Sequence, residues 1–379
     1  MIKVEQFKAG EIRLGRSYKY FMPCLVNTDW IWNDPKINKL IENASFQLGQ
    51  LNSYALLVPN IDLFIHLHIT KEAVISSKIE GTQTHFDEAF LQKENVNPER
   101  KDDWQEVQNY TQALNDAIVE LEKLPISSRL ILSTHQILME GVRGEKKTPG
   151  EYRRSQNWIG GKSLADAVFI PPHHDELPEL IGDLENFIHN EQLEIPILIK
   201  AAILHYQFET IHPFLDGNGR IGRLLITLFL IEKQVLTKPL LYLSSYFEKN
   251  KNLYYDNLTK VRTHNDMVQW IKYFLVGIAQ TAQIAVETLS NILELKANTE
   301  QIIQAEFGKR IKTGLKLHAY LLEQPIVTIK QVASICDLSP KAAGELVNLF
   351  VEKQILKVFA GQYRNRIFSY DPYLNLFYD

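Results

Sequence analysis

Residues 212–223 read His-Pro-Phe-Leu-Asp-Gly-Asn-Gly-Arg-Ile-Gly-Arg and join two segments with helical periodicity. Apolar residues recur at spacings of three and four before this stretch, over 196–211, and after it, over 220–233. Pro213 and the glycines stop the first helix and form a turn in which backbone N–H groups can converge. The second helix begins there, so its unpaired N–H groups and positive dipole end face the same point. The stretch therefore predicts an anion site between two helices.

The side chains of this turn predict phosphoryl-type transfer chemistry. Arg220 and Arg223 lie three residues apart at a helix start, where two cations are unfavourable unless an anion neutralises them. Asp216 offers a hard oxygen ligand, and Mg²⁺ typically takes one or two carboxylates together with phosphate oxygens. His212 titrates near neutrality and suits the deprotonation of an attacking hydroxyl. The sequence contains no Gly-x-x-x-x-Gly-Lys-Ser/Thr P-loop, so a different phosphate site is predicted.

Two metal-site alternatives for this region are weaker. Residues 216–219 could begin an EF-hand loop, but Ile221 stands where that loop needs Gly and Thr227 where it needs Glu. His205 lies seven residues before His212 and could share its helix face, yet no further ligand spacing supports a metal pair. We therefore expect His205 to be a hydrogen-bonded structural residue.

Helical periodicity dominates the rest of the body. Further amphipathic helices are predicted over residues 36–58, 61–80, 104–121, 128–139, 177–189 and 266–293. Strand signal in the body is confined to 157–159 and 167–170, which flank a Gly-Gly-Lys-Ser run and predict a short hairpin ending at two prolines. A two-stranded hairpin is marginal by itself, so this hairpin must pack against another element.

Composition describes an ordinary globular protein. The chain has 379 residues, of which 45% are hydrophobic and 23% charged, which excludes disorder and collagen and suggests about two or three domains. No apolar run approaches the roughly 18 residues of a membrane span, and the first residues lack the apolar stretch of a signal peptide. We therefore expect a cytoplasmic protein without a membrane partner. Cys24 and Cys336 lie far apart and predict neither a disulfide framework nor a zinc site.

Charge is distributed unevenly along the chain. The formal net charge is −4, which argues against nucleic-acid binding by the whole protein. Residues 309–370 nevertheless hold ten Lys and Arg against four Asp and Glu, a net of +6, so the remainder carries −10. This asymmetry predicts a basic C-terminal module attached to an acidic body.

The C-terminal pattern predicts a winged helix-turn-helix. Helical segments over 315–323, 329–336 and 340–353 precede β-rich runs over 355–360 and 366–370, which surround Gly361-Gln362. An equally good interpretation is a packing or oligomerisation module that never contacts DNA. Spacing alone does not choose between the two.

Residues 212–223 resemble, at every defining position, the motif His-Pro-Phe-x-Asp-Gly-Asn-Gly-Arg-x-x-Arg of the Fic family, whose typical members transfer AMP from ATP to a protein hydroxyl. The resemblance covers roughly residues 20–290. The run 149–154 and the following hairpin are similar to the family's target-binding flap, and residues 20–95 resemble its N-terminal extension. The phosphate-transferring death-on-curing branch has a lysine where this chain has Gly219, so the resemblance implies adenylyl transfer.

The resemblance implies a mainly α fold: a Fic-type helical bundle with a small β-hairpin flap, followed by a winged helix-turn-helix domain. Three domains are expected: an N-terminal helical extension with the inhibitory motif at 1–100, the catalytic core at 101–295, and the winged module at 310–379. The Lys-Ala-Asn-Thr-Glu run at 296–300 marks the last boundary.

The resemblance also implies a role for each site residue. His212 would be the general base for the target hydroxyl, and Asp216 would hold Mg²⁺. The expected contacts to the phosphates of ATP come from Gly217, Asn218, Gly219, Arg220 at the β-phosphate and Arg223 at the γ-phosphate. A tyrosine pair, Tyr254 and Tyr255, falls where the family lines its adenine pocket, and Arg262 stands near the position of an adenine-contacting Asn in some members.

Residues 76–81 resemble the family's inhibitory pattern Ser/Thr-x-x-x-Glu-Gly/Asn. Ser76 and Glu80 lie one helical turn apart, and Gly81 can end the helix with a positive φ. The hypothesis is that Glu80 pairs with Arg223 at the γ-phosphate position, so ATP either fails to bind or binds with a misaligned α-phosphate.

Three functions are weighed on this basis. The first is a Mg²⁺-dependent, self-inhibited protein adenylyltransferase that modifies Ser, Thr or Tyr of a target protein and of itself. The second is removal of AMP at the same site, and the third is a DNA-binding regulator with a nucleotide-sensing core. The intact motif favours the first. The expected partners are a protein substrate at the flap (157–172), with a homodimer and DNA contact through 310–370 as open hypotheses.

Overall fold

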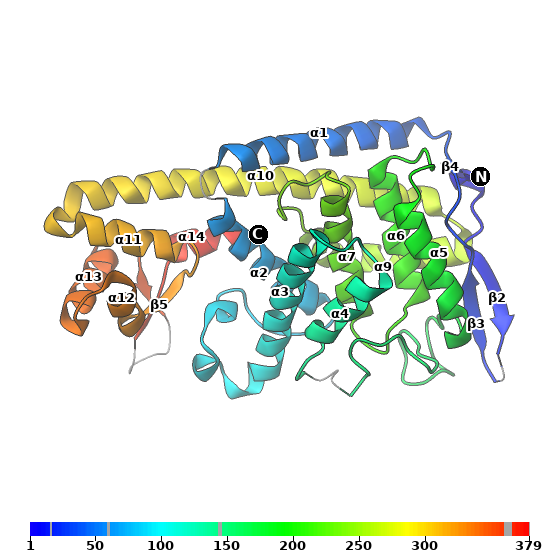
Figure 1. The fold of residues 1–379 in the computed structure, drawn as a ribbon, viewed down its shortest axis with the longest axis horizontal. Coiled ribbons are helices and arrows are strands. Elements are labelled where there is room, and N and C mark those ends of the chain that lie inside the picture. Colours follow the sequence, from blue (N-terminus) through cyan, green and yellow to red (C-terminus); the bar gives the residue numbers. More distant parts are fainter. Residues whose placement is uncertain (16, 59–60, 143–145, 360–365, 379) are drawn as a thin grey trace.

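The computed structural model describes residues 1–15, 17–58, 61–142, 146–359 and 366–378 and is mainly helical (Figure 1). The helices are α1 (Pro35–Leu57), α2 (Asp62–Ile79), α3 (Lys101–Leu121), α4 (Ser128–Leu138), α5 (Leu177–His189), α6 (Ile197–Ile211), α7 (Asn218–Glu232), α8 (Ser244–Lys249), α9 (Lys251–His264), α10 (Met267–Glu306), α11 (Ile311–Leu321), α12 (Ile329–Cys336), α13 (Pro340–Glu352) and α14 (Asp371–Leu374). The strands are β1 (Ile2–Lys3), β2 (Gly10–Leu14), β3 (Lys19–Pro23), β4 (Trp30–Ile31), β5 (Ile326–Thr328), β6 (Lys357–Val358) and β7 (Ile367–Ser369). No described helix has the length and hydropathy needed to cross a membrane.

The centre of the body is formed by α6 and α7, which pack against each other. Residues 198–211 of α6 are buried without interruption, which is why this helix shows little difference between its faces. Trp270 on α10 is fully buried, and its indole N–H donates to the carbonyl of Ala202 on α6 (2.8 Å). The turn between α6 and α7 therefore starts and ends on helices held in the core.

The long helix α10 runs along α1 and continues beyond the body (Figure 1). The other helices predicted in the body are confirmed, but α10 extends to Glu306, so the boundary run at 296–300 lies inside a helix. Lys296 and Glu300 form an ion pair across one turn (2.7 Å), and no Pro or Gly interrupts the segment. The C-terminal unit is thus attached through a continuous helix rather than a flexible linker.

The C-terminal unit contains α11, α12 and α13 and a sheet with strand order β5-β7-β6. The strand β5 is too short to show a periodic signal and was not predicted; it pairs antiparallel with β7. Ala360, Gly361 and Gln362 of the predicted wing lie outside the described residues. The winged-helix interpretation stays a prediction. The chain then returns to the body, where the C-terminus lies near α2 (Figure 1), and Phe377 contacts His68 (5.1 Å between ring centroids).

The sequence analysis expected a helical N-terminal extension. The first part of this extension instead contains strands. The strands β2 and β3 form an antiparallel hairpin, and β1 pairs parallel with β4. Every residue of β2 is exposed, and its alternation of Ile12 and Leu14 with two charged residues is too short to identify a strand.

The predicted hairpin at 157–170 is reduced to one antiparallel bridge between Ile159 and Phe169. It packs against β3, where the N–H of Phe21 donates to the carbonyl of Ile170 (2.9 Å) and the rings of Phe21 and Phe169 lie 5.8 Å apart. The segment therefore relies on the N-terminal strands for its position.

The packing of α10 predicts that alanine substitution of two isoleucines on that helix changes the free energy of unfolding by different amounts. Ile278 is fully buried and Ile284 is 51% exposed. Ile278→Ala should lower the free energy of unfolding by about 2–5 kcal/mol, because it leaves a cavity in a close-packed core. The matched control Ile284→Ala should change it by less than about 0.5 kcal/mol. Urea denaturation followed by circular dichroism measures both, and equal losses would contradict the packing.

Candidate active site

The turn between α6 and α7 begins with His212 in the left-handed region (φ 50°, ψ 60°). This conformation is costly for a residue with a side chain and needs support from its surroundings. The carbonyl of His212 accepts hydrogen bonds from Nε of Arg153 (3.0 Å) and Nδ2 of Asn157 (3.1 Å). Asn218 clamps the turn from within: its Oδ1 accepts from the N–H of Phe214 and its Nδ2 donates to the same residue's carbonyl (both 2.8 Å). The backbone that carries His212 is therefore held from both sides.

His135 on α4 supports the middle of the turn. Its ring stacks on Phe214 with centroids 3.8 Å apart and 9° between planes. The N–H of Gly150 donates to Nδ1 (2.9 Å), so Nε2 carries the proton and donates to the carbonyl of Asp216 (3.0 Å). Gly217 has φ 80°, and a Cβ there would lie 2.9 Å from Sδ of Met139. Glycine is required at this position by conformation and by space.

A cavity of about 460 Å³ lies beside this turn. Its walls come from the end of α2, from α6 and α7, from α9 and from the segment around the Ile159–Phe169 bridge. Seven residues singled out from the sequence line it: Glu80, His212, Gly219, Arg223, Tyr254, Tyr255 and Arg262. Asp216, Gly217, Asn218, Arg220 and Ser76 are not among its lining residues. The structure thus brings the predicted base, two arginines, the tyrosine pair and the inhibitory glutamate to one space.

Arg223 is buried, and each of its described hydrogen bonds goes to α2 or the residue that ends it. Its Nε donates to Oγ of Ser76 (2.8 Å), and its Nη2 donates to the carbonyl of Ser76 (2.9 Å) and to Oε1 of Glu80 (2.7 Å). Gly219 makes room for this carboxylate, since a Cβ there would lie 2.2 Å from Oε1 of Glu80. Burial raises the pKa of Glu80, but the charge and hydrogen bond of Arg223 lower it by more. Glu80 is therefore ionised and paired.

The imidazole of His212 is neutral at neutral pH. Burial, together with the charges of Arg262 and Arg153, lowers its pKa to about 3, although Glu80 acts in the opposite direction. A neutral ring can accept a proton, but its low basicity means that transfer occurs only as the partner hydroxyl becomes acidic.

The sequence analysis expected Arg220 and Arg223 to face the same anion. In the structure Arg220 does not line the cavity. Its Nη1 donates to Oε2 of Glu106 on α3 (3.0 Å), and its Nη2 lies 3.5 Å from Oδ1 of Asp216. The arginine is 4% exposed, so a buried carboxylate neutralises it. Glu106 precedes it by 114 residues, and no local pattern reveals such a partner.

Asp216 fits the role of a cation ligand. Its side chain is 45% exposed, and Oδ1 accepts from the N–H of Gly217 (2.6 Å). Within the described residues no contact engages Oδ2, which leaves one carboxylate oxygen for Mg²⁺.

A separate group of metal-type ligands, His173, His174 and Asp175, lies in the loop before α5.

The two tyrosines differ in burial: Tyr254 lies in the core, and Tyr255 is partly exposed. Tyr254 is 1% exposed, and its hydroxyl donates to Nε2 of His205 (2.9 Å), whose Nδ1 donates to the carbonyl of Gly222 (3.0 Å). Tyr255 is 40% exposed. His205 is thus a hydrogen-bonded core residue, as expected, and Tyr255 is the tyrosine with an accessible ring.

Two cavity residues were missed or underused in the sequence analysis. Glu209 is 6% exposed, and burial raises its pKa to about 7 although Arg223 opposes the shift. Arg262 donates to the carbonyl of Glu209 (3.2 Å) and to Oγ1 of Thr210 (3.2 Å), and its guanidinium lies 4.0 Å from the centre of the Phe169 ring. The one sequence signal for Glu209 is that it is the single carboxylate of a mainly apolar helix, three residues before His212.

Comparison with known proteins identifies two family regions. Residues 38–119 match the Fic/DOC family N-terminal region, and residues 125–230 match the Fic/DOC family. The chain therefore contains Fic/DOC family domains.

Curated proteins are similar to part of this chain. A probable protein adenylyltransferase of Aquifex aeolicus is 34% identical over 172 residues, which are 45% of this chain and 50% of that protein. The protein adenylyltransferase Fic of Drosophila melanogaster is 24% identical over 229 residues, which are 60% of this chain and 41% of that protein. The chain spans half or less of the length of these relatives.

Solved structures share the fold. A Fic family protein from Desulfovibrio desulfuricans superposes with a TM-score of 0.56 and 20% identity, covering 89% of this chain and 96% of that one. A Fic domain containing signaling protein from Bacteroides thetaiotaomicron gives a TM-score of 0.51 and 19% identity, covering 67% and 96%. The mainly helical Fic fold is therefore shown.

The buried carboxyl of Glu209 predicts a pH-dependent stability difference. Its pKa of about 7 in the folded chain exceeds the unfolded value of about 4.3. The folded state therefore holds a proton that the unfolded state has released, and stability falls as pH rises between these values. Glu209→Gln removes this loss.

The free energy of unfolding of Glu209→Gln relative to wild type should therefore increase from about pH 4.5 to about pH 7 and then level off. Denaturation at several pH values measures this difference. A difference that does not change with pH would show that Glu209 is already ionised in the folded chain.

Proposed function

We propose that this chain is a protein adenylyltransferase that moves AMP from ATP to a Ser, Thr or Tyr hydroxyl of a target protein and of itself. The observation that carries the proposal is the cavity where His212 stands beside Gly219 and Arg223, at the start of a helix. Helix N-termini with glycine turns bind phosphates. The curated relatives named protein adenylyltransferase point to the same activity.

In the proposed reaction His212 is the base, and the turn that follows it binds the phosphates. The target hydroxyl approaches between the bridge segment and His212, whose neutral ring accepts the proton while the oxygen attacks the α-phosphorus and pyrophosphate leaves. The backbone N–H groups of Gly217, Asn218 and Gly219 would contact the phosphates. Bound at Asp216, Mg²⁺ would supply positive charge to the phosphate oxygens. Catalysis would depend on position and charge rather than on covalent chemistry by the protein.

The adenine would lie against α9. Tyr255 offers the accessible ring and Tyr254 backs it from the core. Arg220 would keep the phosphate loop in place through Glu106 and Asp216, instead of contacting the β-phosphate as the resemblance implies. Its role in the proposal is therefore positioning.

The proposal includes self-inhibition by Glu80. The carboxylate lies at the guanidinium that the γ-phosphate would need, and Ser76 takes the remaining described hydrogen bonds of Arg223. The pair is charge-assisted and partly buried, with the Glu80 side chain 35% exposed. ATP can place its γ-phosphate on Arg223 only after Glu80 has moved.

The partners are proposed from two surfaces. A target protein would dock at residues 157–172, where the bridge segment offers backbone groups to an extended chain. The C-terminal unit would bind DNA or another protein through residues 310–370, whose excess of lysine and arginine suits an acidic partner.

Labelled ATP tests the transfer and its control. Wild type, Glu80→Gly and His212→Ala are incubated with Mg²⁺ and ATP labelled on the α- or the γ-phosphate, and label on protein is followed. Label from α-phosphate alone is expected, with Glu80→Gly at least about tenfold above wild type and His212→Ala lower by about 10²–10⁴-fold. Glu80→Gln, which removes the charge but keeps a polar side chain, should fall between wild type and Glu80→Gly.

Other outcomes contradict parts of the proposal. Label from the γ-phosphate would mean that the nucleotide is oriented for phosphate transfer. Equal α-label in wild type and Glu80→Gly would contradict inhibition by Glu80. No label in any variant, even with cell lysate as target, would overturn adenylyl transfer in favour of AMP removal or of a regulator acting through the C-terminal unit.

A further inference from the structure

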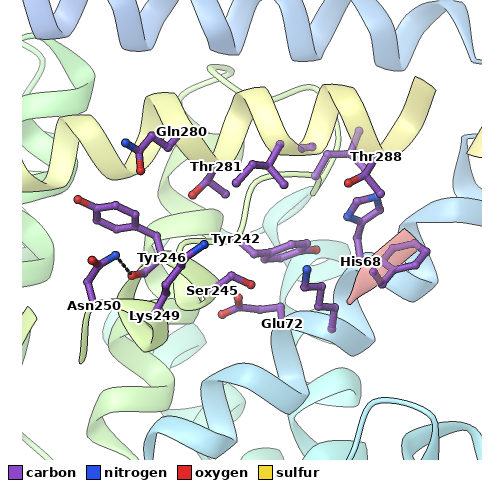
Figure 2. A pocket seen from close by; sticks show the side chains of 15 residues that line it. His68, Glu72, Tyr242, Ser245, Tyr246, Lys249, Asn250, Gln280, Thr281 and Thr288 are labelled. Atoms are coloured by element: carbon purple, nitrogen blue, oxygen red, sulfur yellow. Dashed lines mark hydrogen bonds between the residues drawn. The ribbon is translucent and has the colours of Figure 1, made fainter. Parts of the chain in front are cut away.

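A second cavity, of about 430 Å³, lies beside α2, among residues of α2, α8 and α10 (Figure 2). One wall is α2, which contributes His68 and Glu72; the others are α8, the segment before it, and α10. Phe377, near the end of the chain, closes one side. The volume falls within the range of about 300–1,000 Å³ that small-molecule sites occupy.

Three residues that line this cavity each have a buried polar atom without a hydrogen-bond partner within the described part of the chain. The atoms are Oε2 of Glu72, Nε2 of His68 and the hydroxyl of Tyr242. The three residues are 3%, 7% and 7% exposed. Buried polar groups are normally satisfied, so a ligand with matching polar groups would be stabilised at this cavity.

Glu72 sets one requirement on that ligand. Its Oε1 already accepts from the hydroxyls of Tyr110 (3.0 Å) and Ser244, whereas Oε2 accepts nothing. Burial raises the pKa of this carboxyl to about 7, although Ser244 and Arg223 oppose the shift. An N–H donor at Oε2 would satisfy the carboxylate and favour its ionised form.

The rest of the lining sets two further requirements. Lys249 contributes positive charge, and Glu72 is the single carboxylate among the described lining residues. Lys249 extends toward Tyr242 (Figure 2), whose hydroxyl can donate to an acceptor. Ile284 and Ala285 on α10 add an apolar surface. The complementary molecule carries an anionic group, N–H donors and an apolar or planar body.

The cavity is connected to the catalytic cleft through one helix. Glu72, Ser76 and Glu80 follow one another at intervals of four residues, so they lie along one side of α2 and its C-terminal end. Glu72 faces the second cavity, while Ser76 and Glu80 hold Arg223. A molecule that bridges α2 to α8 and α10 stabilises the observed position of α2 by binding to it preferentially.

We infer that the cavity between α2, α8 and α10 is a regulatory site for a small organic anion with N–H donors, and that its occupation keeps Glu80 on Arg223. Nucleoside monophosphates and apolar α-amino acids both have this chemistry, and AMP and L-phenylalanine serve as probes of the two sources. The binding claim stands independently, whereas the inhibitory consequence rests on the proposed transferase activity.

Calorimetric titration of the full chain tests binding with matched variants. Thr281→Trp on α10 fills the cavity, and Gln283→Trp places the same bulk on an exposed position of α10 outside it. Wild type and Gln283→Trp should bind one of the probes, Thr281→Trp should not, and Glu72→Gln should bind about tenfold or more weakly because one acceptor is lost. Circular dichroism and the thermal midpoint verify that each variant is folded.

Three results would overturn the site. Neither probe binding to wild type would contradict the assigned ligand chemistry. Binding that persists in Thr281→Trp would place the probe elsewhere, for AMP in the catalytic cleft. Equal affinity of wild type and Glu72→Gln would remove Glu72 from recognition.

Transfer assays separate the site from its consequence. The bound probe should lower α-phosphate labelling in wild type and leave Glu80→Gly and Thr281→Trp unchanged. Binding without this inhibition in an active enzyme would overturn the coupling through α2. Binding in a protein that labels nothing would contradict the proposed function while supporting the site.

Discussion

The guanidinium of Arg223 is buried between α7 and α2, and the geometry of the cleft depends on it. Its charge cannot remain in the core without a carboxylate or hydrogen-bond acceptors, because an unpaired buried charge costs several kcal/mol. The end of α2 provides both, through Ser76 and Glu80. The same contacts that satisfy the arginine also occupy it. A phosphate group and the Glu80 carboxylate are chemically interchangeable partners for this guanidinium, and stability and inhibition therefore share one interaction.

The loop that carries His212 shows a second use of buried polar groups. Arg153 is 2% exposed and donates to the carbonyls of His212, Ser155 and Pro172. Burial lowers its pKa to about 10, so it remains charged at neutral pH. Neutral carbonyl dipoles thus hold a cation close to the imidazole, which helps to keep the ring unprotonated. Support of the backbone and control of the base come from the same residue.

The helix α2 lies where the parts of the molecule meet. Its C-terminal end reaches the catalytic cleft through Glu80, its middle lines the cavity at Glu72, and Phe377 of the C-terminal unit packs on His68. The continuous helix α10 joins the C-terminal unit to the body, and the Phe377 contact joins that unit to α2 directly. The position of α2 also sets the partner of Arg223, because Ser76 and Glu80 belong to its C-terminal end.

Features that depend on neighbours along the chain could be predicted from the amino-acid sequence. The helices around 212–223, the glycine turn, the one-turn spacing of Ser76 and Glu80 and the structural nature of His205 follow from periodicity, capping and residue chemistry, which act over a few residues. The side-chain contacts between distant elements became known from the tertiary structure. Glu106 pairs with Arg220, and Tyr254 is hydrogen-bonded in the core. Arg262 packs on Phe169, and β3 supports the bridge segment. The structure also shows that α10 extends beyond residue 300, and that Oε2 of Glu72 has no hydrogen-bond partner among the described residues. These partners come from elements far apart in sequence, and burial, which sets both their pairing and their pKa values, exists only once those elements have packed.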